Sequence, residues 1–473
     1  MDRREFLSWV QGGLSGAALA TLLSQAKPAR AKEPGDAKPP GPHFAPRATR
    51  AIHICLCGAM SHLDTFDFKP DLIKAHGKPI NSPNKPDTFF GQVGRLRQPD
   101  WNFKQRGESG LWVSDLFPTL AQVADELTVI RSMVAETSNH TPATFQENSG
   151  FRLNGFPSAG AWLSYGLGSE SDDLPAFVVI PDAREFPAGG ATNWTNGFLP
   201  ARHQGVVIRP QGEPIDDLFP ATPVGPESEA LTRELVTSMN QGHIERHPGD
   251  DALMARMRGY EMAARMQISV PLVADLNDEN RETLSLYGID RPQSADFGRA
   301  CLLGRRLLER GVRFVQIYAG GTFGSPRRNW DGHEDMKANH AQEAARVDRP
   351  IAGLLRDFRR RGLLDDTLVL LTTEFGRTPF SQSGAETVGL GRDHNPLGFC
   401  VWLAGAGLKH GMAYGSTDEI GWKATDNVVT WPDFHATVLH LLGIDHTRLT
   451  FYHNGIERRL TNVHGEVIKA ILA

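Results

Sequence analysis

The residues best suited to chemistry stand in two short polar segments late in the chain. Residues 367–371 form an unbroken apolar run that ends just before Glu374, the pattern of a central parallel strand covered by helices on both faces. Ligands of open α/β sheets bind beyond the carboxyl ends of such strands, so we expect Glu374 at a site of chemistry. Arg377 and Arg392 offer planar guanidinium donors to an oxyanion, and His394 follows in the second segment.

Two other segments carry residue types that bind metal ions. Asp331 and His333 lie in a loop after an apolar run at 311–318, and a carboxylate with an imidazole is a suitable pair of ligands for a divalent cation. The apolar run at 51–57 ends in a glycine-led loop that contains Asp64, where α/β hydrolases place a hard metal ligand. Asp64 would serve equally well as a helix cap or a turn residue, so both interpretations stay open.

A hydroxyl group and a histidine stand together at an expected helix start. Thr141 precedes Pro142, which predicts threonine at the N-cap and proline at the first helical position. The positive end of the helix dipole would favour a nucleophile, or a bound phosphate or sulfate, at this place. A plain N-cap explains Thr141 equally well, but the adjacent His140 favours a functional role.

The elements that must position these residues are typical of an α/β protein. Apolar runs alternate with amphipathic segments along the chain, which predicts a three-layer α/β/α sandwich around a mostly parallel sheet. We expect strands at 51–57, 127–133, 176–181, 311–318, 367–371 and 398–403, and helices at 111–127, 297–310, 337–361, 431–442 and 460–473.

The chain divides into a leader, a linker and one large domain. Residues 1–31 contain a twin-arginine motif, a short apolar segment and a small-residue cleavage site, so we expect export by the twin-arginine translocase to the periplasm or beyond. Cleavage after the leader is favoured over its retention as an anchor. Residues 32–50 are expected to be a flexible linker and residues 51–473 the folded domain, with an inserted cap at about 184–281 that narrows a substrate pocket.

Composition excludes several classes of function. The 473 residues carry 50 Lys+Arg against 55 Asp+Glu, a formal net charge of −5, so no basic excess favours nucleic acid. No stretch of the mature chain is long and apolar enough to cross a membrane. The four cysteines are expected in the core rather than in disulfides, with a Cys55/Cys57 metal pair as the weaker alternative.

Several motifs together resemble an exported, sulfatase-like family of unknown function that is abundant in planctomycetes and belongs to the alkaline phosphatase superfamily. The resemblance covers almost the whole mature chain and implies an alkaline phosphatase-like fold. The motifs are the twin-arginine leader, GAMSHLDTFD at 58–67, SNHTPATFQENSGF at 138–151, NWDGHED at 329–335, TTEFGRTP at 372–379 and GRDHNPLGFCVWLAGAG at 391–407.

The resemblance also implies two metal sites and a nucleophile. One site would use Asp64, Thr141 and Glu374, and the other Asp331, His333 and His394, with Thr141 at the nucleophile position.

Three departures from the superfamily pattern bear on this assignment. Phe375 stands where the superfamily has histidine, so the first metal would need an imidazole from His140 or His62. The gap between Asp331 and His333 is shorter than usual. No cysteine lies in the sequence context that matures to formylglycine, so we do not expect formylglycine chemistry.

Two functions are compatible with these observations. The first is an exported, metal-dependent hydrolase of small-molecule or polysaccharide sulfate or phosphate esters, with one or two divalent ions among Zn, Ca, Mg and Mn. The second is a non-catalytic member that binds glycans or takes part in envelope assembly, which Phe375 favours. The candidate metal ligands are Asp64, Asp331, His333, Glu374 and His394, and the candidate catalytic residues are Thr141, His140, Arg377 and Arg392.

Overall fold

The computed structural model describes residues 39–473, except for 82–85, 87, 217, 219–224, 247–250 and 323–326. The predicted leader at 1–31 and the first part of the predicted linker lie outside the described residues.

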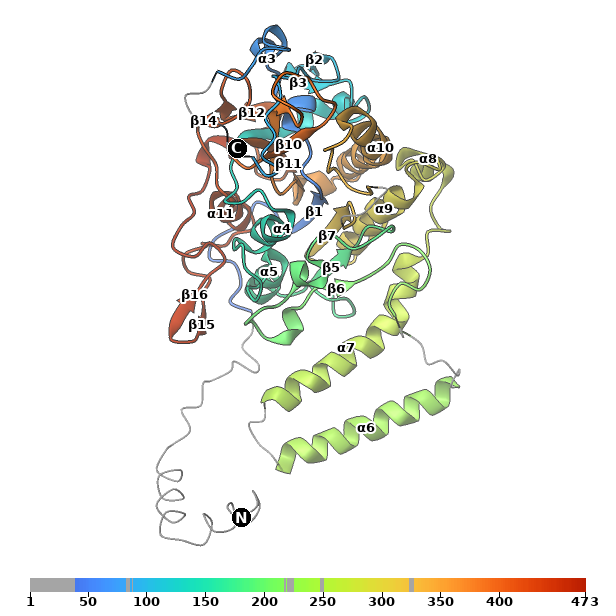
Figure 1. Cartoon of the computed structure of the whole chain (residues 1–473). Helices are drawn as coiled ribbons and strands as arrows, with labels where there is room; N and C mark the ends of the chain where they lie inside the picture. Colours follow the sequence, from blue (N-terminus) through green and yellow to red (C-terminus); the bar gives the residue numbers. More distant parts are fainter. Residues whose placement is uncertain are drawn as a thin grey trace, which may run out of the picture. The chain divides into compact units, whose positions relative to one another are not determined.

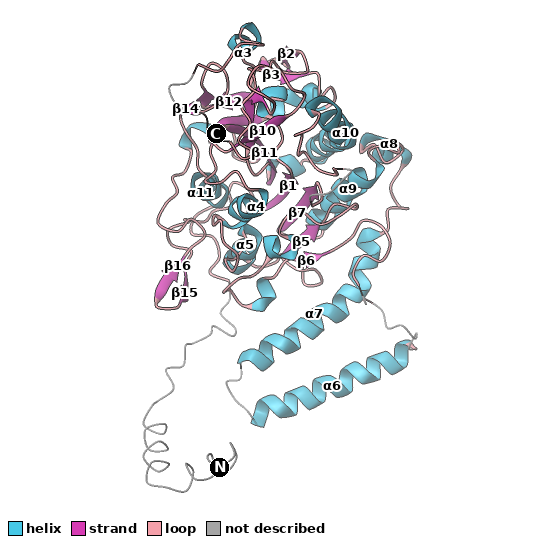
Figure 2. Ribbon diagram, viewed as in Figure 1, coloured by secondary structure: helices cyan, strands magenta, loops and turns pink. Residues whose placement is uncertain are grey.

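One eight-stranded sheet forms the centre of the main body, residues 39–223 and 261–473 (Figure 1, Figure 2). The strand order is β12-β4-β11-β8-β1-β7-β5-β6. Strand β11 pairs antiparallel with β4 and β8, and the other pairings are parallel, which confirms a mostly parallel sheet. The strands are β1 (Arg50–Leu56), β4 (Thr128–Met133), β5 (Phe177–Ile180), β6 (Val206–Val207), β7 (Phe314–Ala319), β8 (Thr367–Thr372), β11 (Phe399–Gly405) and β12 (Met412–Tyr414).

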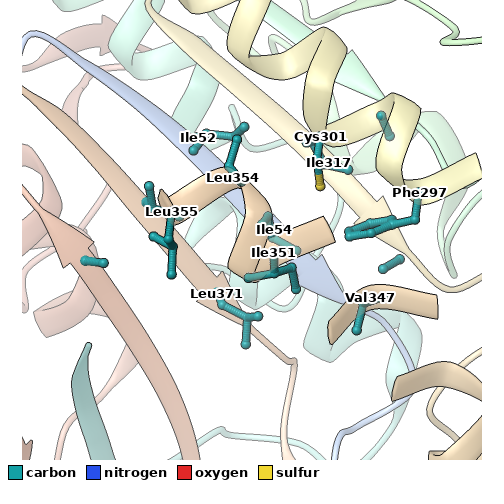
Figure 3. Close-up of a cluster of buried hydrophobic side chains, with 14 of the residues drawn as sticks. Ile52, Ile54, Phe297, Cys301, Ile317, Val347, Ile351, Leu354, Leu355 and Leu371 are labelled. Atoms are coloured by element: carbon teal, nitrogen blue, oxygen red, sulfur yellow. The ribbon is translucent and has the colours of Figure 1, made fainter. Parts of the chain in front are cut away.

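Helices cover both faces of this sheet. Alternate residues of β1 face opposite sides, with Ile52 and Ile54 in one core and Ala51 and Cys55 in the other. The first core includes side chains from α9 and α10, as Figure 3 shows, and the second includes side chains from α4, α5 and α11. These helices are α4 (His140–Ser149), α5 (Ala159–Leu167), α9 (Ala295–Glu309), α10 (Met336–Arg361) and α11 (Trp431–Leu441). The predicted three-layer sandwich is confirmed, and all four cysteines are buried and unpaired.

Smaller elements complete the described chain. They are η1 (His62–Asp64), α3 (Pro70–Lys74), β2 (Phe103–Arg106), β3 (Leu111–Ser114), η2 (Leu120–Glu126), η3 (Gly190–Trp194), η4 (Ala201–His203), α6 (Pro226–Arg246), α7 (Asp251–Ala274), α8 (Arg281–Leu286), η5 (Leu363–Asp365), β9 (Gly376–Ser381), β10 (Arg392–Asn395), β13 (Ser416–Thr417), β14 (Ala424–Asp426), β15 (Phe451–His453), β16 (Ile456–Arg458) and η6 (Lys469–Ile471).

Two predicted helices are wrong. Residues 111–127 form strand β3, a turn and the 3-10 helix η2, because Pro118 disfavours helical backbone in the residue before it and donates no amide hydrogen bond. Residues 460–473 contain only the short 3-10 helix η6. Gly465 has φ +99°, a backbone conformation that interrupts a right-handed helix.

The segment predicted as a cap does not form one unit. Helix α6 and α7 up to Tyr260 belong to one compact unit, whereas α7 from Glu261 onward belongs to the other, the main body. Val270 and Val273 are buried in the main core, and β6 pairs with β5 in the central sheet. That the segment narrows a substrate pocket stays a prediction.

The described part of the predicted linker is hydrogen-bonded to the main body. The backbone N–H of Gly41 donates to the Gly166 carbonyl at 2.8 Å, and that of Arg47 donates to the Leu441 carbonyl at 2.9 Å. Residues 39–50 therefore follow a defined path. Among the described helices, none combines the length and the apolar character needed to cross a bilayer.

Candidate metal centre

The candidate residues from four segments meet beyond the carboxyl edge of the central sheet. Glu374 closely follows β8, Asp331 lies in the connection after β7, and His140 is the first residue of α4. The two-stranded ladder of β9 and β10 sets Arg377 opposite His394.

The approach of two of these loops depends on Gly58. Its φ is +110°, and a Cβ added there would lie 2.5 Å from the backbone nitrogen of Trp330. That nitrogen donates to the Cys57 carbonyl at 2.9 Å. Only glycine allows this contact, which brings the loop carrying Asp331 against the end of β1.

Asp331 is at the centre of a group of three histidines. Its Oδ1 lies 2.8 Å from Nε2 of His333, 3.3 Å from Nε2 of His140 and 3.4 Å from Nε2 of His394. The Nε2 atoms of His333 and His394 are 2.8 Å apart. All four side chains are buried, and one ligand atom from each lies within 4.8 Å of the others. We call these four residues the Asp331 cluster.

Each histidine of the Asp331 cluster has its other ring nitrogen fixed by an oxygen acceptor. Because carboxylate, carbonyl and amide oxygens accept but do not donate, each Nδ1 carries a proton. A neutral ring can then present its Nε2 lone pair to a metal ion, and a protonated ring donates Nε2–H to Asp331 when no ion is bound. Metal-binding histidines are oriented in this way. The contacts are His140 Nδ1 to Glu374 Oε1 at 2.6 Å, His394 Nδ1 to the Ser138 carbonyl oxygen at 2.5 Å, and His333 Nδ1 to Gln382 Oε1.

This arrangement fits a divalent metal ion. The Nε2 atoms of His333 and His394 lie 2.8 Å apart, close enough for one proton or one metal ion to be shared between them. Ligand atoms roughly 3 Å apart are what bonds of about 2.0–2.1 Å to imidazole and carboxylate produce. Imidazoles with one carboxylate suit Zn²⁺ and similar transition metals better than Ca²⁺ or Mg²⁺, which prefer oxygen ligands.

Neighbouring positive charges keep Asp331 ionised. Burial alone would raise the pKa of its carboxyl group, but Arg377 and the hydrogen bonds from the three cluster histidines hold that pKa far below its ordinary range. The Nη2 atom of Arg377 lies 2.7 Å from Asp331 Oδ1, and Arg327 contacts Oδ2. The carboxylate is therefore available as a ligand at any physiological pH.

Glu374 joins the cluster through His140. Burial lowers the pKa of His140, but hydrogen bonds to Asp331 and Glu374 outweigh burial, and the pKa is raised overall. Glu374 Oε1 also accepts the Gly58 N–H at 2.8 Å, and the Thr373 hydroxyl donates to Oε2 at 3.3 Å. With these partners, Glu374 orients the His140 ring.

Asp64 and Arg392 pair with each other outside the Asp331 cluster. Arg392 Nε lies 3.0 Å from Asp64 Oδ2, and both side chains are 0% exposed. Asp64 also accepts from the Ser61 hydroxyl at 2.6 Å and from the Asp100 N–H at 2.8 Å. The structure therefore does not bring Asp64 to the other candidate ligands.

Neither candidate arginine has an exposed guanidinium. Arg377 and Arg392 are both 0% exposed. Within the described chain, Arg392 donates hydrogen bonds to Asp64 and otherwise only to backbone carbonyls. Each of its three guanidinium nitrogens therefore has a hydrogen-bond acceptor in the protein. Those carbonyls belong to Thr378, Arg97 and Gln98, each at 3.0 Å.

Thr141 is placed differently from the prediction. The N-cap of α4 is Asn139, and Thr141 lies in the first turn, one residue after His140. Pro142 is tolerated there because the first amides of a helix have no intrahelical acceptor. Thr141 is half-buried.

His140, and not His62, supplies the additional imidazole. His62 is buried elsewhere, with its Nε2 2.8 Å from the Gly421 carbonyl oxygen. Phe375 packs its ring 4.8 Å from the His140 ring and 4.7 Å from the His394 ring. The residue that departs from the superfamily pattern thus supports two cluster histidines by packing.

Two aromatic side chains that we did not single out cover the Asp331 cluster. The ring of Phe89 lies 4.8 Å from that of His394, and the ring of Phe90 lies 4.8 Å from that of His333. Both phenylalanines are exposed on their outer side, by 45% and 51%. The only sequence signal for them is an adjacent aromatic pair in a polar segment.

A surface cleft of about 690 Å³ lies elsewhere in the described part of the molecule. Its walls include Gln146, Trp431 and Asp433, but no residue of the Asp331 cluster.

A second buried polar group lies between the sheet and α4. His53 Nε2 is 2.7 Å from the Thr372 hydroxyl, which also donates to Glu147 Oε1, and Cys55 Sγ is 3.4 Å from His53 Nε2. Ligand atoms of His53, Cys55 and Glu147 lie within 4.8 Å of one another. The Sγ atom of Cys57 instead contacts the Cys55 carbonyl oxygen at 3.8 Å.

We expect Glu147→Gln to stabilise the protein at neutral pH. Burial, then the negative charge of Glu374, raises the pKa of Glu147 well above its ordinary value. Between the unfolded pKa of about 4.3 and the folded value, only the folded state binds this proton, so wild-type stability falls as pH rises. The gain is about 1.4 kcal/mol for each unit of the pKa difference.

Denaturant unfolding from pH 4 to pH 8 tests this expectation. The stability difference between Glu147→Gln and wild type should grow with pH. Burial lowers the pKa of His53 to about 3, so His53 makes stability rise with pH in both proteins, and this contribution cancels in the difference. A destabilised variant that also loses a bound metal ion would show instead that Glu147 is a metal ligand.

We expect Gly391→Ala to destabilise the protein by about 3 kcal/mol, the upper end of the usual overpacking range. A Cβ at this position would lie 1.6 Å from the carbonyl oxygen of His333 and 2.2 Å from its carbonyl carbon. Backbone atoms cannot rotate away, so the loop must shift and metal affinity should fall. Gly384→Ala is the control, because its nearest neighbour is the Thr387 hydroxyl at 3.9 Å. Thermal unfolding with and without added Zn²⁺ measures both effects, and equal behaviour of the two variants would contradict the prediction.

Comparison with known proteins places the chain in a family. A family profile described as "Protein of unknown function (DUF1501)" matches residues 48–472. No curated protein matches the sequence.

Similar solved structures share little sequence with this chain. The lipoteichoic acid synthase LtaP from Listeria monocytogenes is 11% identical, over 89% of this chain and 79% of that chain, with a TM-score of 0.36. A protein in the alkaline phosphatase superfamily from Vibrio parahaemolyticus is 13% identical, over 94% and 76%, with a TM-score of 0.35. The alkaline phosphatase from the Antarctic bacterium TAB5 is 11% identical, over 84% and 98%, with a TM-score of 0.33. At this level of similarity, nothing about the activity of this chain follows.

Proposed function

This chain belongs to the DUF1501 family of proteins of unknown function, and we propose that it is a metal-dependent hydrolase of phosphate or sulfate esters. The observation that supports the proposal is the convergence of three Nε2 atoms on the carboxylate of Asp331. Together with the fixed Nδ1 protons, it is the arrangement of a metal site. A structural core alone does not require three imidazoles around one carboxylate.

The residues of the Asp331 cluster would hold the metal ion. A bound divalent cation supplies positive charge against which the negative charge of the ester builds up in the transition state. Asp331 accepts the ion as a carboxylate, and Glu374, the Ser138 carbonyl and Gln382 keep the three imidazoles in the ligating tautomer.

Thr141 is the candidate nucleophile. It lies in the first turn of α4, where backbone N–H groups and the helix dipole attract an anionic ester. Its neighbour His140 ties that turn to the cluster. Of the arginines that contact Asp331, Arg327 is the partly exposed one, with 25% of its side chain accessible. We therefore assign Arg327, rather than Arg377 or Arg392, to the anionic oxygens of the substrate.

The site of action that we propose is outside the cytoplasm. The predicted leader at residues 1–31 supports this part of the proposal. The twin-arginine route transports folded chains, so a metal ion bound in the Asp331 cluster would be exported with the protein.

One observation favours the non-catalytic alternative, a glycan-binding or envelope assembly protein. Asp331 and His394 are only 2% and 3% exposed, and Phe89 and Phe90 cover the cluster from outside. A metal ion enclosed in this way would stabilise the fold without contacting a substrate.

Metal content and turnover together test the proposed function. We expect at least one divalent ion per chain, and turnover of a member of a panel of aryl sulfates, phosphomonoesters and phosphodiesters with Zn²⁺, Mn²⁺, Ca²⁺ or Mg²⁺. His394→Ala should lose both the ion and turnover, whereas the exposed-site control His410→Ala should keep them. No turnover with any ester, combined with glycan binding that a chelator does not change, would support the non-catalytic alternative.

A further inference from the structure

We propose that Arg377 permanently takes the position of a second cation, so that the centre holds one metal ion rather than two. This inference rests on the proposed function in one respect, the binding of metal by the Asp331 cluster. It concerns the residues on the other side of the Asp331 carboxylate.

The guanidinium of Arg377 lies in a cage of oxygen atoms. It is 0% exposed and contacts Asp331 Oδ1 at 2.7 Å. The remaining acceptors are Nε2 of His333, at 3.5 Å, and backbone carbonyls that converge from three segments of the chain. These carbonyls belong to Ala59 at 2.8 Å, Arg392 at 3.3 Å, Trp330 at 3.4 Å, and Gly58.

These acceptors form a ligand set for a hard cation. Carbonyl oxygens with one carboxylate are the ligands that Ca²⁺ prefers, and Mg²⁺ likewise binds oxygen. A buried guanidinium needs the same surroundings, because it donates five hydrogen bonds and carries a full charge. The charge that a second ion would bring next to Asp331 is therefore already present, covalently attached to the chain.

Glu374 and Asp64, the carboxylates that the superfamily resemblance assigns to the other metal ion, already have partners within the protein. Glu374 accepts hydrogen bonds from His140, the Gly58 N–H and the Thr373 hydroxyl. Asp64 is paired with Arg392 at 3.0 Å. Arg392 thus neutralises Asp64, and Glu374 is bound to His140. A second ion would find neither a place nor a free ligand.

Arg377 acts in this proposal as a positioning residue. All three of its nitrogens contact protein acceptors, and it does not reach the surface. Its effect on an ester is transmitted through Asp331, whose negative charge it shares with the metal ion. The number of ions bound, rather than activity alone, reports this role.

Counting ions in the full mature chain tests the inference. Wild type, saturated with Zn²⁺ and Ca²⁺ together and then desalted, should hold one ion per chain, and Arg377→Lys should also hold one. Arg377→Ala should hold two, the second being Ca²⁺, and added guanidinium at non-denaturing concentration should displace that Ca²⁺. Arg346→Ala is the matched control, because Arg346 is also buried and pairs with Asp182 at 2.6 Å; it should destabilise the fold without changing the count.

Each other outcome has a definite meaning. Two ions in wild type would overturn this inference and leave the proposed function intact. No ion in wild type would overturn the proposed function itself. A folded Arg377→Ala that holds one ion and does not respond to guanidinium would also overturn the inference. If Arg377→Ala does not fold, the number of ions bound by wild type and by Arg377→Lys tests the inference, and two ions in either protein would overturn it.

Discussion

Asp331→Asn is expected to release the metal ion and abolish turnover. The carboxylate contacts all three cluster imidazoles as well as Arg377, so an amide in its place removes the only negative charge at the centre of the group. We expect metal affinity to fall by more than about 100-fold, which is the upper end of the loss seen when only an outer-shell partner is removed.

The same substitution should also destabilise the metal-free fold. Arg377 is 0% exposed, and removing its carboxylate partner leaves a buried charge uncompensated, at a cost of about 3–5 kcal/mol. Elemental analysis and urea unfolding of the chelator-treated protein measure the two effects separately. Glu334→Gln is the control, since Glu334 lies in the same loop but its side chain is 70% exposed. An Asp331→Asn variant that keeps one ion per chain would show that the imidazoles alone hold the metal.

The central sheet could be predicted because burial on both faces leaves a plain signal in the sequence. The run at 367–371 is β8 in the structure, the run at 51–57 is its neighbour β1, and the run at 311–318 is β7 on the other side of β1. Where a segment is half-buried and irregular, the signal is weaker. Residues 111–127 have apolar residues at helical spacing, but Pro118 and the pairing of β3 with β2 decide their structure.

The candidate site could be predicted in part. Residue types at the ends of strands indicate which side chains could bind a metal ion, but not which other side chains they contact. The structure brings Asp331, His333 and His394 together, as the resemblance implies, and adds His140. Asp64 also lies after a buried strand, but it forms an ion pair with Arg392, which is more than 300 positions away in the chain. Long-range pairing of this kind leaves no local pattern.

Some parts of the site leave almost no signal of any kind. Gln382 fixes the tautomer of His333, and a backbone carbonyl does the same for His394. Every residue has a carbonyl, and an isolated glutamine is ordinary on any surface. The sequence therefore indicates which side chains bind a metal more readily than which groups orient them.

Asp64→Asn should destabilise the protein strongly and leave its metal content unchanged. The Asp64–Arg392 pair is fully buried, with both side chains 0% exposed, so loss of one partner costs about 3–5 kcal/mol. Burial would raise the pKa of Asp64, but Arg392, Arg97 and the Ser61 hydroxyl outweigh it and lower that pKa overall. Wild type therefore gains stability from Asp64 above the unfolded pKa of about 3.9 and loses it as pH falls through the folded value.

Urea unfolding of Asp64→Asn between pH 3 and pH 7, with elemental analysis of the folded protein, separates the two roles of this residue. Asp71→Asn is the control, because its ion pair with Lys74 is exposed and such pairs contribute little. The double variant Asp64→Leu/Arg392→Met should recover much of the lost stability, since apolar pairs often replace buried ion pairs without loss. Asp64→Asn could instead stay stable and bind one ion fewer than wild type. Asp64 would then be the metal ligand that the superfamily resemblance implies, and Arg392 would neutralise it only while no ion is bound.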